Sequence, residues 1–232
     1  MVLLTTSAAQ PDARTEAKAI IELFTSQGCS SCVAADAYFA ELAKRPDVVA
    51  LSLHVDYWDY LGWQDTLSDP TNTERQRSYA AVHGTRRVYT PQMIVNGSAD
   101  FVGSDRNAIE AAIGRSRLPV PVSMWKGHGT IEIEVGRLET PHRLPSTIRL
   151  VLLTSEAEVA IGRGENAGST IDYYNVVRTI RPVGMWDGQP VKITLPANEL
   201  MGKGVDSCAI IVQEDRTDGL GAIVGAAWLG GW

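Results

Sequence analysis

Two cysteines stand three residues apart in the segment Cys29-Ser30-Ser31-Cys32. An apolar run at residues 19–24 predicts a strand just before them, and apolar residues at helical spacing follow from residue 34. We therefore expect Cys29 at or near the first turn of a helix, where unpaired backbone N–H groups and the helix dipole stabilise a thiolate. This arrangement predicts a redox site that alternates between a dithiol and a disulfide. A structural disulfide or a chance spacing is the alternative.

The dipeptide Thr90-Pro91 follows the cysteines by about 60 residues and comes directly before a predicted strand and the hairpin signal Asn96-Gly97. In thioredoxin-like folds a cis-proline lies at this place, packed against the cysteine pair. Cis X-Pro bonds are a minority of about 5–6% in folded proteins, so the context predicts the isomer here. A cis bond would expose the backbone of Thr90 as an edge for an extended substrate peptide. It would also put the apolar Pro91 ring where a metal ligand could otherwise stand beside the thiols.

The third cysteine, Cys208, lies inside an apolar run and is expected to pack in the core. The chain has no second Cys-X-X-Cys pair, and its histidines are scattered at His54, His83, His128 and His142, which argues against a structural zinc site. Soft thiolates select Cu(I), so a copper site made of Cys29, Cys32 and His54 is one alternative. His54 is otherwise expected to be a satisfied group at a strand end.

The composition limits the classes of partner. The chain of 232 residues has a formal net charge of −6 and no run of Lys or Arg, which argues against nucleic-acid binding. No apolar stretch approaches the roughly 20 residues needed to cross a bilayer, so no transmembrane segment is expected. Residues 1–18 are expected to be either a flexible leader or the remnant of a secretory signal. We expect a periplasmic or secreted protein rather than a cytoplasmic one.

Residues 19–118 alternate strand and helix patterns in the order βαβαββα, which predicts an α/β domain with a central mixed sheet flanked by helices. Asp69-Pro70 and Asp105 mark helix starts, and Pro46 ends the first helix. The aromatic segment at residues 57–63 is expected to cover the core or a domain interface, with a peptide-binding patch as the alternative. The expected strands lie at residues 19–24, 47–55, 93–95 and 99–102, and the expected helices at 34–44, 69–83 and 105–117.

The segment Leu118-Pro119-Val120-Pro121 breaks this pattern and is the predicted domain boundary. Residues 119–232 are expected to form a small, mainly antiparallel β domain. The glycine-rich stretch at residues 162–166 lacks the strand–loop–helix frame of a phosphate loop and is expected to be a hairpin loop. The expected strands lie at residues 131–135, 148–153, 191–195, 208–212 and 222–228.

Several segments together resemble a known family of bacterial proteins. They are residues 22–32 with Ala35-Asp36, residues 54–59, Tyr89-Thr90-Pro91-Gln92, Asn96-Gly97, residues 162–166 and residues 173–177. The family is the uncharacterised, usually exported one filed as domain of unknown function 1223, within the thioredoxin-like superfamily. The chain departs from it at Val33-Ala34, where two prolines are expected, so the helix start would be less rigid here.

The resemblance implies roles for individual residues. Cys29 would attack a substrate disulfide as the thiolate, and Cys32 would resolve the mixed disulfide. Thr90 and Pro91 would shape the substrate groove. Thioredoxins also bury an acid on the strand before the cysteines, and Glu22 is the nearest candidate for that proton-transfer role. If the two halves pack together, the loop at residues 162–166 would lie over the cysteines.

The predicted function is that of a thiol–disulfide oxidoreductase acting on extracytoplasmic protein thiols or disulfides, with a redox partner of unknown identity. The redox-active disulfide would serve in place of a separate cofactor. Two alternatives use the same scaffold: a non-catalytic thioredoxin-like binding module, and a copper-handling protein.

Overall fold

The computed structural model describes residues 17–231, apart from residues 86, 139–143, 201 and 203. Over these residues the chain forms one eight-stranded mixed sheet, helices that pack on both of its faces, and a separate three-stranded antiparallel sheet. The expected mixed α/β class with an antiparallel β region is therefore confirmed. The predicted leader falls mostly on residues 1–16, and His142 falls in a gap, so both lie outside the described residues.

The first half of the chain follows the predicted order βαβαββα. The central strand β1 pairs in parallel with β2 and antiparallel with β3, and β3 forms a hairpin with β4. The hairpin turns at Asn96 and Gly97, whose φ values of 51° and 65° are those that an Asn-Gly turn favours. The elements are β1 (Ala19–Thr25), α1 (Val33–Ala43), β2 (Val48–His54), α2 (Pro70–Val82), β3 (Gln92–Val95), β4 (Ala99–Val102) and α3 (Arg106–Arg115).

Local capping explains where two of these helices begin. The Asp69 side chain accepts a hydrogen bond from the backbone N–H of Thr71 at 2.8 Å, and Pro70 occupies the first turn of α2. At α3, Asp105 accepts a bond from the N–H of Ala108 at 3.1 Å. Both starts were expected from the sequence because a cap depends only on residues that are neighbours in the chain.

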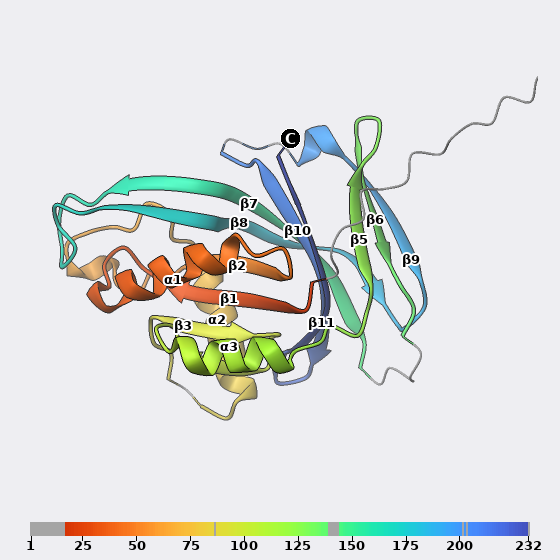
Figure 1. The fold of residues 1–232 in the computed structure, drawn as a ribbon, viewed down its shortest axis with the longest axis horizontal. Helices are drawn as coiled ribbons and strands as arrows, with labels where there is room; N and C mark the ends of the chain where they lie inside the picture. Colours follow the sequence, from red (N-terminus) through yellow and green to blue (C-terminus); the bar gives the residue numbers. More distant parts are fainter. Residues whose placement is uncertain (1–16, 86, 139–143, 201, 203, 232) are drawn as a thin grey trace, which may run out of the picture.

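The second half of the chain extends the same sheet. Strand β8 lies beside β2, with Ser52 and Val176 as the bridging pair, and the full strand order is β11-β10-β7-β8-β2-β1-β3-β4 (Figure 1). The small sheet has the order β5-β6-β9. The sequence did not predict β5 or β8. The elements are β5 (Val122–Lys126), β6 (Thr130–Val135), β7 (Ser146–Ala160), β8 (Thr170–Trp186), β9 (Val191–Pro196), β10 (Ser207–Arg216) and β11 (Gly219–Gly230).

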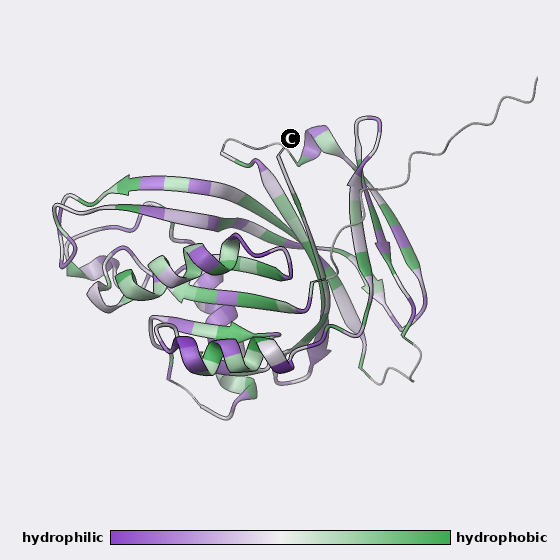
Figure 2. Cartoon of the chain, viewed as in Figure 1, coloured by the Kyte–Doolittle hydropathy of each residue, from purple (hydrophilic) through white to green (hydrophobic). Residues whose placement is uncertain are grey.

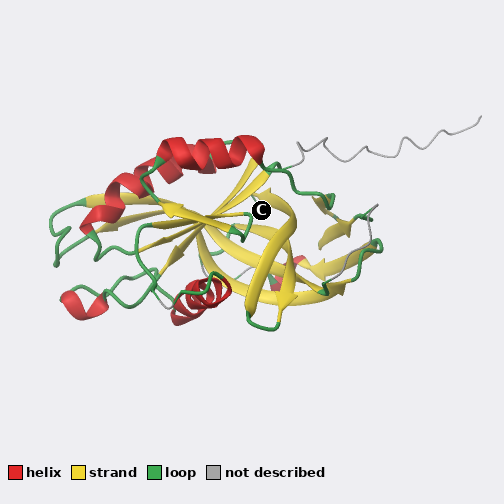
Figure 3. Ribbon diagram, turned by 90° about the horizontal axis from the view of Figure 1, so that it is seen from below, coloured by secondary structure: helices red, strands yellow, loops and turns green. Residues whose placement is uncertain are grey.

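Alternation along β1 divides the core into two layers. Ile21 and Leu23 face α1 and α3, whereas Ile20 and Phe24 face α2. Figure 3 shows α1 and α2 on opposite sides of the sheet, and in Figure 2 the central strands are mostly hydrophobic. A third apolar cluster joins the small sheet to β7 and β10. No helix among the described residues is long and apolar enough to cross a membrane.

Candidate redox site

The two cysteines of the Cys-X-X-Cys segment form a disulfide, with their Cα atoms 5.4 Å apart. Cys29 is the N-cap residue of a short 3-10 helix, η1 (Ser30–Cys32), which runs directly into α1. The expected position of the pair at a helix start is therefore confirmed. Both cysteine side chains are fully buried, although Ser30 and Ser31 between them are exposed. The Cys29 Sγ lies 3.3 Å from the Ser31 Oγ.

The peptide bond between Thr90 and Pro91 is cis, as expected. A Cβ atom placed on Gly103 would lie 2.9 Å from the Pro91 Cβ and 3.0 Å from the Ala35 Cβ. The proline and the first turn of α1 therefore approach each other so closely at Gly103 that only glycine fits there without a shift. This contact holds the Thr90-Pro91 segment against the helix that carries Cys32.

The aromatic segment after β2 covers the residues just before the cysteines. Trp58 donates from Nε1 to the Thr90 Oγ1 at 2.8 Å, and its Cβ would lie 3.2 Å from a Cβ on Gly28. Trp63 donates from Nε1 to the Gln27 Oε1 at 2.8 Å. These two rings therefore act as a cover, one of the two roles expected for this segment.

A buried carboxyl group lies one helical turn beyond the second cysteine. Asp36 follows Cys32 by four residues on α1, and its Oδ1 accepts a hydrogen bond from the Thr25 Oγ1 at 2.9 Å. Burial raises the pKa of Asp36 to about 7, against the lowering effects of the His54 charge and the Thr25 bond. No role was predicted for Asp36, although its position four residues after Cys32 in a predicted helix could have marked it as a neighbour of that cysteine.

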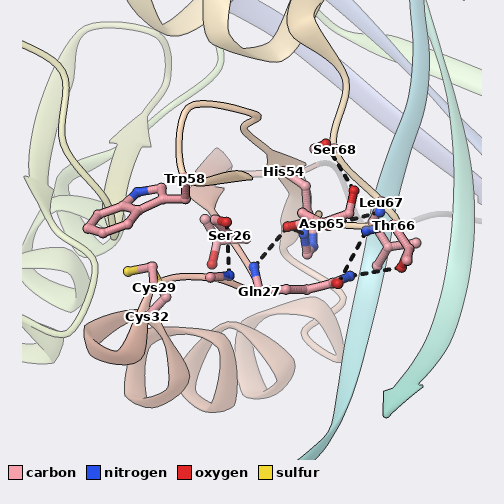
Figure 4. Close-up of polar contacts among 12 residues, drawn as sticks. Ser26, Gln27, Cys29, Cys32, His54, Trp58, Asp65, Thr66, Leu67 and Ser68 are labelled. Atoms are coloured by element: carbon pink, nitrogen blue, oxygen red, sulfur yellow. Dashed lines mark hydrogen bonds and ion pairs between the residues drawn. A yellow bond between two sulfur atoms is a disulfide. The ribbon is translucent and has the colours of Figure 1, made fainter. Parts of the chain in front are cut away.

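His54 ends β2 in a fully buried position and pairs with a second acid. Its Nδ1 lies 2.8 Å from the Oδ2 of Asp65, which also accepts a bond from the backbone N–H of Gln27 at 2.8 Å. Burial acts to raise the pKa of Asp65, but the His54 charge and the bonds from His54, Gln27 and Leu67 hold it below its usual value. Figure 4 shows Gln27 between the cysteines and the His54–Asp65 pair. Asp65 was also missed, because nothing in its local sequence marks it as buried.

Polar atoms without a hydrogen-bond partner among the described residues gather in the same region. They are the Ser52 Oγ, the His54 Nε2 and the Tyr173 Oη, all buried. The Tyr173 ring comes from β8 and meets the His54 ring edge-on, with their centroids 4.6 Å apart. Burial raises the pKa of Tyr173, and the nearby charges of Asp36 and Asp65 raise it further. The surroundings of His54, on the same side of the sheet as Asp36, are therefore polar, and buried polar atoms of this kind are commonly satisfied by ordered water.

The glycine-rich loop of the second half lies over the cysteine segment, as expected. Asn166 donates from Nδ2 to the backbone carbonyls of Gln27 at 2.9 Å and Cys29 at 3.2 Å. The Glu165 Oε2 accepts a bond from the backbone N–H of Ser30 at 3.3 Å, and the bonds from Ser30 lower the pKa of Glu165. The β7–β8 hairpin carries this loop across α1 to the start of the helix (Figure 1).

Glu22 lies on the other face of β1 from α1. Its Oε1 is 2.6 Å from the Nε of Arg75 on α2, and its Oε2 accepts a hydrogen bond from the Tyr79 hydroxyl. Arg75 also donates to the Gln213 Oε1 at 3.0 Å, so the cluster joins β1, α2 and β10. Strand alternation puts residue 22 on the α2 face, because its neighbours on both sides face α1. The expectation that Glu22 serves the cysteines is thereby corrected, since Asp36 and Asp65 are the buried acids described on the other face of β1.

The third cysteine lies away from the cysteine pair, in another part of the core. Cys208 is buried in β10 within the cluster that packs under the small sheet, as predicted. Among the described residues, no group of three or more His, Cys, Asp or Glu side chains is arranged to hold a metal ion. Copper binding by Cys29, Cys32 and His54 stays a prediction, and it would concern the reduced pair.

A family model described as a protein of unknown function (DUF1223) matches residues 20–213. The chain belongs to this family. This DUF1223 protein is also similar to a protein from Agrobacterium tumefaciens whose crystal structure is known, with a TM-score of 0.84 and 36% sequence identity over 95% of this chain and 97% of that one. No curated protein matches the chain. The family description names no activity, so the function of this DUF1223 protein has to be argued from its site.

Proposed function

We propose that this protein is a thiol–disulfide oxidoreductase of the thioredoxin-like superfamily, acting on protein thiols or disulfides outside the cytoplasm. The observation that supports it most is the combination at one helix start: a Cys29–Cys32 disulfide, the cis Thr90-Pro91 segment and the buried Asp36. A disulfide persists more readily in an oxidising compartment than in the cytosol, which supports an exported location.

The proposed reaction is a two-electron exchange. A thiolate of a substrate dithiol attacks the Cys29 Sγ, a mixed disulfide forms, and the bond to Cys32 breaks so that its sulfur leaves as a thiolate and takes up a proton. The second substrate thiol then gives up its proton and attacks its partner sulfur, which releases Cys29 as a thiol. The substrate has lost two electrons and two protons, and the cysteine pair has gained both. The reverse sequence reduces a substrate disulfide.

Asp36 suits the proton transfer at the second cysteine. It lies one turn from Cys32, and its pKa of about 7 allows it both to give and to accept a proton near neutral pH. Protonated Asp36 would supply the proton when Cys32 leaves, and the carboxylate would take the proton back when Cys32 attacks the mixed disulfide.

An extended segment of a substrate protein would lie along the exposed side of the Thr90-Pro91 turn. Tyr60 is 80% exposed and Leu61 is 39% exposed, and both come from the loop that carries Trp58. If a substrate segment lies along this turn, these exposed side chains would offer it apolar contacts, which favours unfolded or extended protein segments as substrates.

The reduction potential of the Cys29–Cys32 pair tests this proposal. Equilibration in dithiothreitol and glutathione buffers, with thiols counted by alkylation and mass spectrometry, should give a value between about −120 and −270 mV, the span of known exchange enzymes. Cys29→Ser should lose exchange with a reduced, unfolded protein, whereas Cys208→Ser should keep it. A pair that stays oxidised until below about −300 mV would instead behave as a structural disulfide.

The second candidate function is a binding module in which the disulfide is structural. The complete burial of both cysteine side chains favours it. In that case a partner protein would be captured equally well by the wild type and by a Cys29→Ser/Cys32→Ser double variant, and no thiol exchange would accompany binding.

A further inference from the structure

We propose that the tip of the β7–β8 hairpin, residues 161–169, controls the access of outside thiols to the Cys29–Cys32 disulfide, and that the Asn166 side chain holds the tip closed. The biological meaning of this control rests on the proposed oxidoreductase function. The tip would set the rate at which any outside thiol, protein or small molecule, reaches the disulfide.

The closed position of the tip depends on one buried amide. Asn166 is only 8% exposed, and its Nδ2 donates to the carbonyls of Gln27 and Cys29 at 2.9 and 3.2 Å. An amide NH₂ has two N–H donors, so both bonds can form at once. The two carbonyls flank Gly28, next to the disulfide, so the tip is attached to the segment that positions the Cys29 sulfur, which an outside thiolate attacks.

An aromatic ring supports the tip from below. Cβ atoms placed on Gly162 and Gly164 would lie 3.2 and 3.3 Å from the Cζ3 and Cβ atoms of Trp63. Gly164 also has a φ of +81°, which L side chains rarely adopt. Because Trp63 itself donates to the Gln27 side chain, the tip and the ring close over the same segment.

The tip is a compact unit that is separable from the sheet. The backbone N–H of Gly168 donates to the Ile161 carbonyl at 2.8 Å, and that of Ile161 donates to the Ser169 carbonyl at 2.9 Å. Strand β8 pairs with β2 only at Val176, and none of the residues at 156–160 and 170–172 is buried. The hairpin is therefore anchored where Tyr173 meets His54 and again at the tip. No residue of the arms between these points is buried, so the tip can lift without breaking the sheet.

The closed tip opposes attack in two ways. Both cysteine side chains are fully buried, whereas a thiolate must reach the Cys29 Sγ along the line of the disulfide bond. The Glu165 carboxylate lies at the Ser30 N–H, where it repels an incoming thiolate and occupies a donor that would stabilise one. On this proposal, opening of the tip weakens both obstacles and so speeds thiol exchange.

The rate of reduction by dithiothreitol tests the proposal, measured by alkylation and mass spectrometry on the intact oxidised protein. Asn166→Ala should be reduced roughly tenfold faster or more, because the closed state loses two hydrogen bonds. The matched control is Ser169→Ala, a small substitution in the same tip at a side chain for which no bond to the cysteine segment is seen among the described residues. It should be reduced at the wild-type rate.

A second variant reaches the tip by a different route. Gly164→Ala leaves the Asn166 amide in place but strains the backbone and crowds Trp63, so it should also accelerate reduction. Circular dichroism and the thermal midpoint establish whether each variant is folded. If either Asn166→Ala or Gly164→Ala is unfolded, the rate for the folded variant decides. Folded variants that are reduced within twofold of the wild-type rate would overturn the proposal.

These measurements distinguish a failure of the access proposal from a failure of the oxidoreductase proposal. Dithiothreitol needs no protein substrate, so faster reduction of the variants together with no exchange with unfolded protein dithiols would support the tip and reject the oxidoreductase. If the wild type exchanges with protein dithiols but the variants are reduced by dithiothreitol at the wild-type rate, the oxidoreductase is supported and the role of the tip is rejected.

Discussion

Replacement of Asp36 by Asn should stabilise the protein at alkaline pH while impairing thiol exchange. The buried carboxyl has a pKa of about 7 instead of 3.8, so the folded protein binds a proton between these values that the unfolded chain releases. The free energy of unfolding therefore falls as the pH rises from about 4 to about 7. Above pH 7 Asp36 causes no further change. The difference between the two pKa values corresponds to about 4 kcal/mol lost from the free energy of unfolding.

The amide that replaces the Asp36 carboxyl in this variant would keep an oxygen for the Thr25 hydroxyl but would carry no charge. Asp36→Asn should therefore match the wild type near pH 4 and exceed it at pH 8, by up to about 4 kcal/mol and by less where water enters the cluster. Urea denaturation of the oxidised protein at a series of pH values measures this directly. Glu41→Gln, an exposed change on the same helix, is the matched control. Because the Arg106 bond lowers the pKa of Glu41, this variant can alter the pH dependence near pH 4–5, but it should leave the fall in stability between about pH 5.5 and 7 unchanged.

The same variant should exchange thiols more slowly by roughly 10²-fold, as general acid–base groups typically contribute that much. A gain in stability with a loss of activity would indicate that the buried acid is kept for function. The reasoning fails if Asp36→Asn loses stability between pH 4 and 7 as steeply as the wild type, since another group would then be titrating. Unchanged exchange kinetics would remove Asp36 from the proton transfer.

Three further changes have expected outcomes. Glu165→Gln removes a negative charge beside the first turn of η1. The redox equilibrium should therefore shift roughly twofold to fivefold toward the reduced form, whose thiolate is then less repelled. A shift toward the disulfide would contradict this. Glu22→Gln leaves the Arg75 guanidinium buried without its ion-pair partner and should cost about 3–5 kcal/mol in urea denaturation, with the potential of the cysteine pair unchanged. Gly103→Ala should cost about 1–3 kcal/mol through its contact with the cis-proline, whereas Gly114→Ala, in open space on α3, should gain up to about 1 kcal/mol; equal thermal midpoints for the two would refute the packing argument.

The sequence by itself determined the features that depend on neighbours along the chain. The strand before the cysteines, the Cys29–Cys32 pair at a helix start and the Asp69 cap of α2 are all as predicted. The Asn96-Gly97 hairpin belongs to the same group, whereas the cis bond before Pro91 was expected only from the place of that proline in thioredoxin-like folds. Turn, cap and periodicity signals operate within a few residues, so they survive whatever the rest of the chain does.

The tertiary structure alone decided which charged groups are buried and which residues meet at the site. In sequence Asp36 is an ordinary helix residue, and it becomes a buried acid only because Thr25, His54 and Tyr173 arrive from three other elements. Glu22 was the acid expected from the sequence because it lies on the strand before the cysteines, yet the alternation of β1 and the position of Arg75 place it on the far face.

Strand β8 shows the same limit on a larger scale. It is 17 residues long, and its polar and apolar residues follow no single period, because parts of it face α1, the sheet core and solvent in turn. Its pairing with β2 joins Val176 to Ser52, and through it the hairpin tip closes over Cys29. Burial and electrostatic surroundings depend on contacts across more than a hundred residues of chain, and such contacts exist only once the sheet has formed.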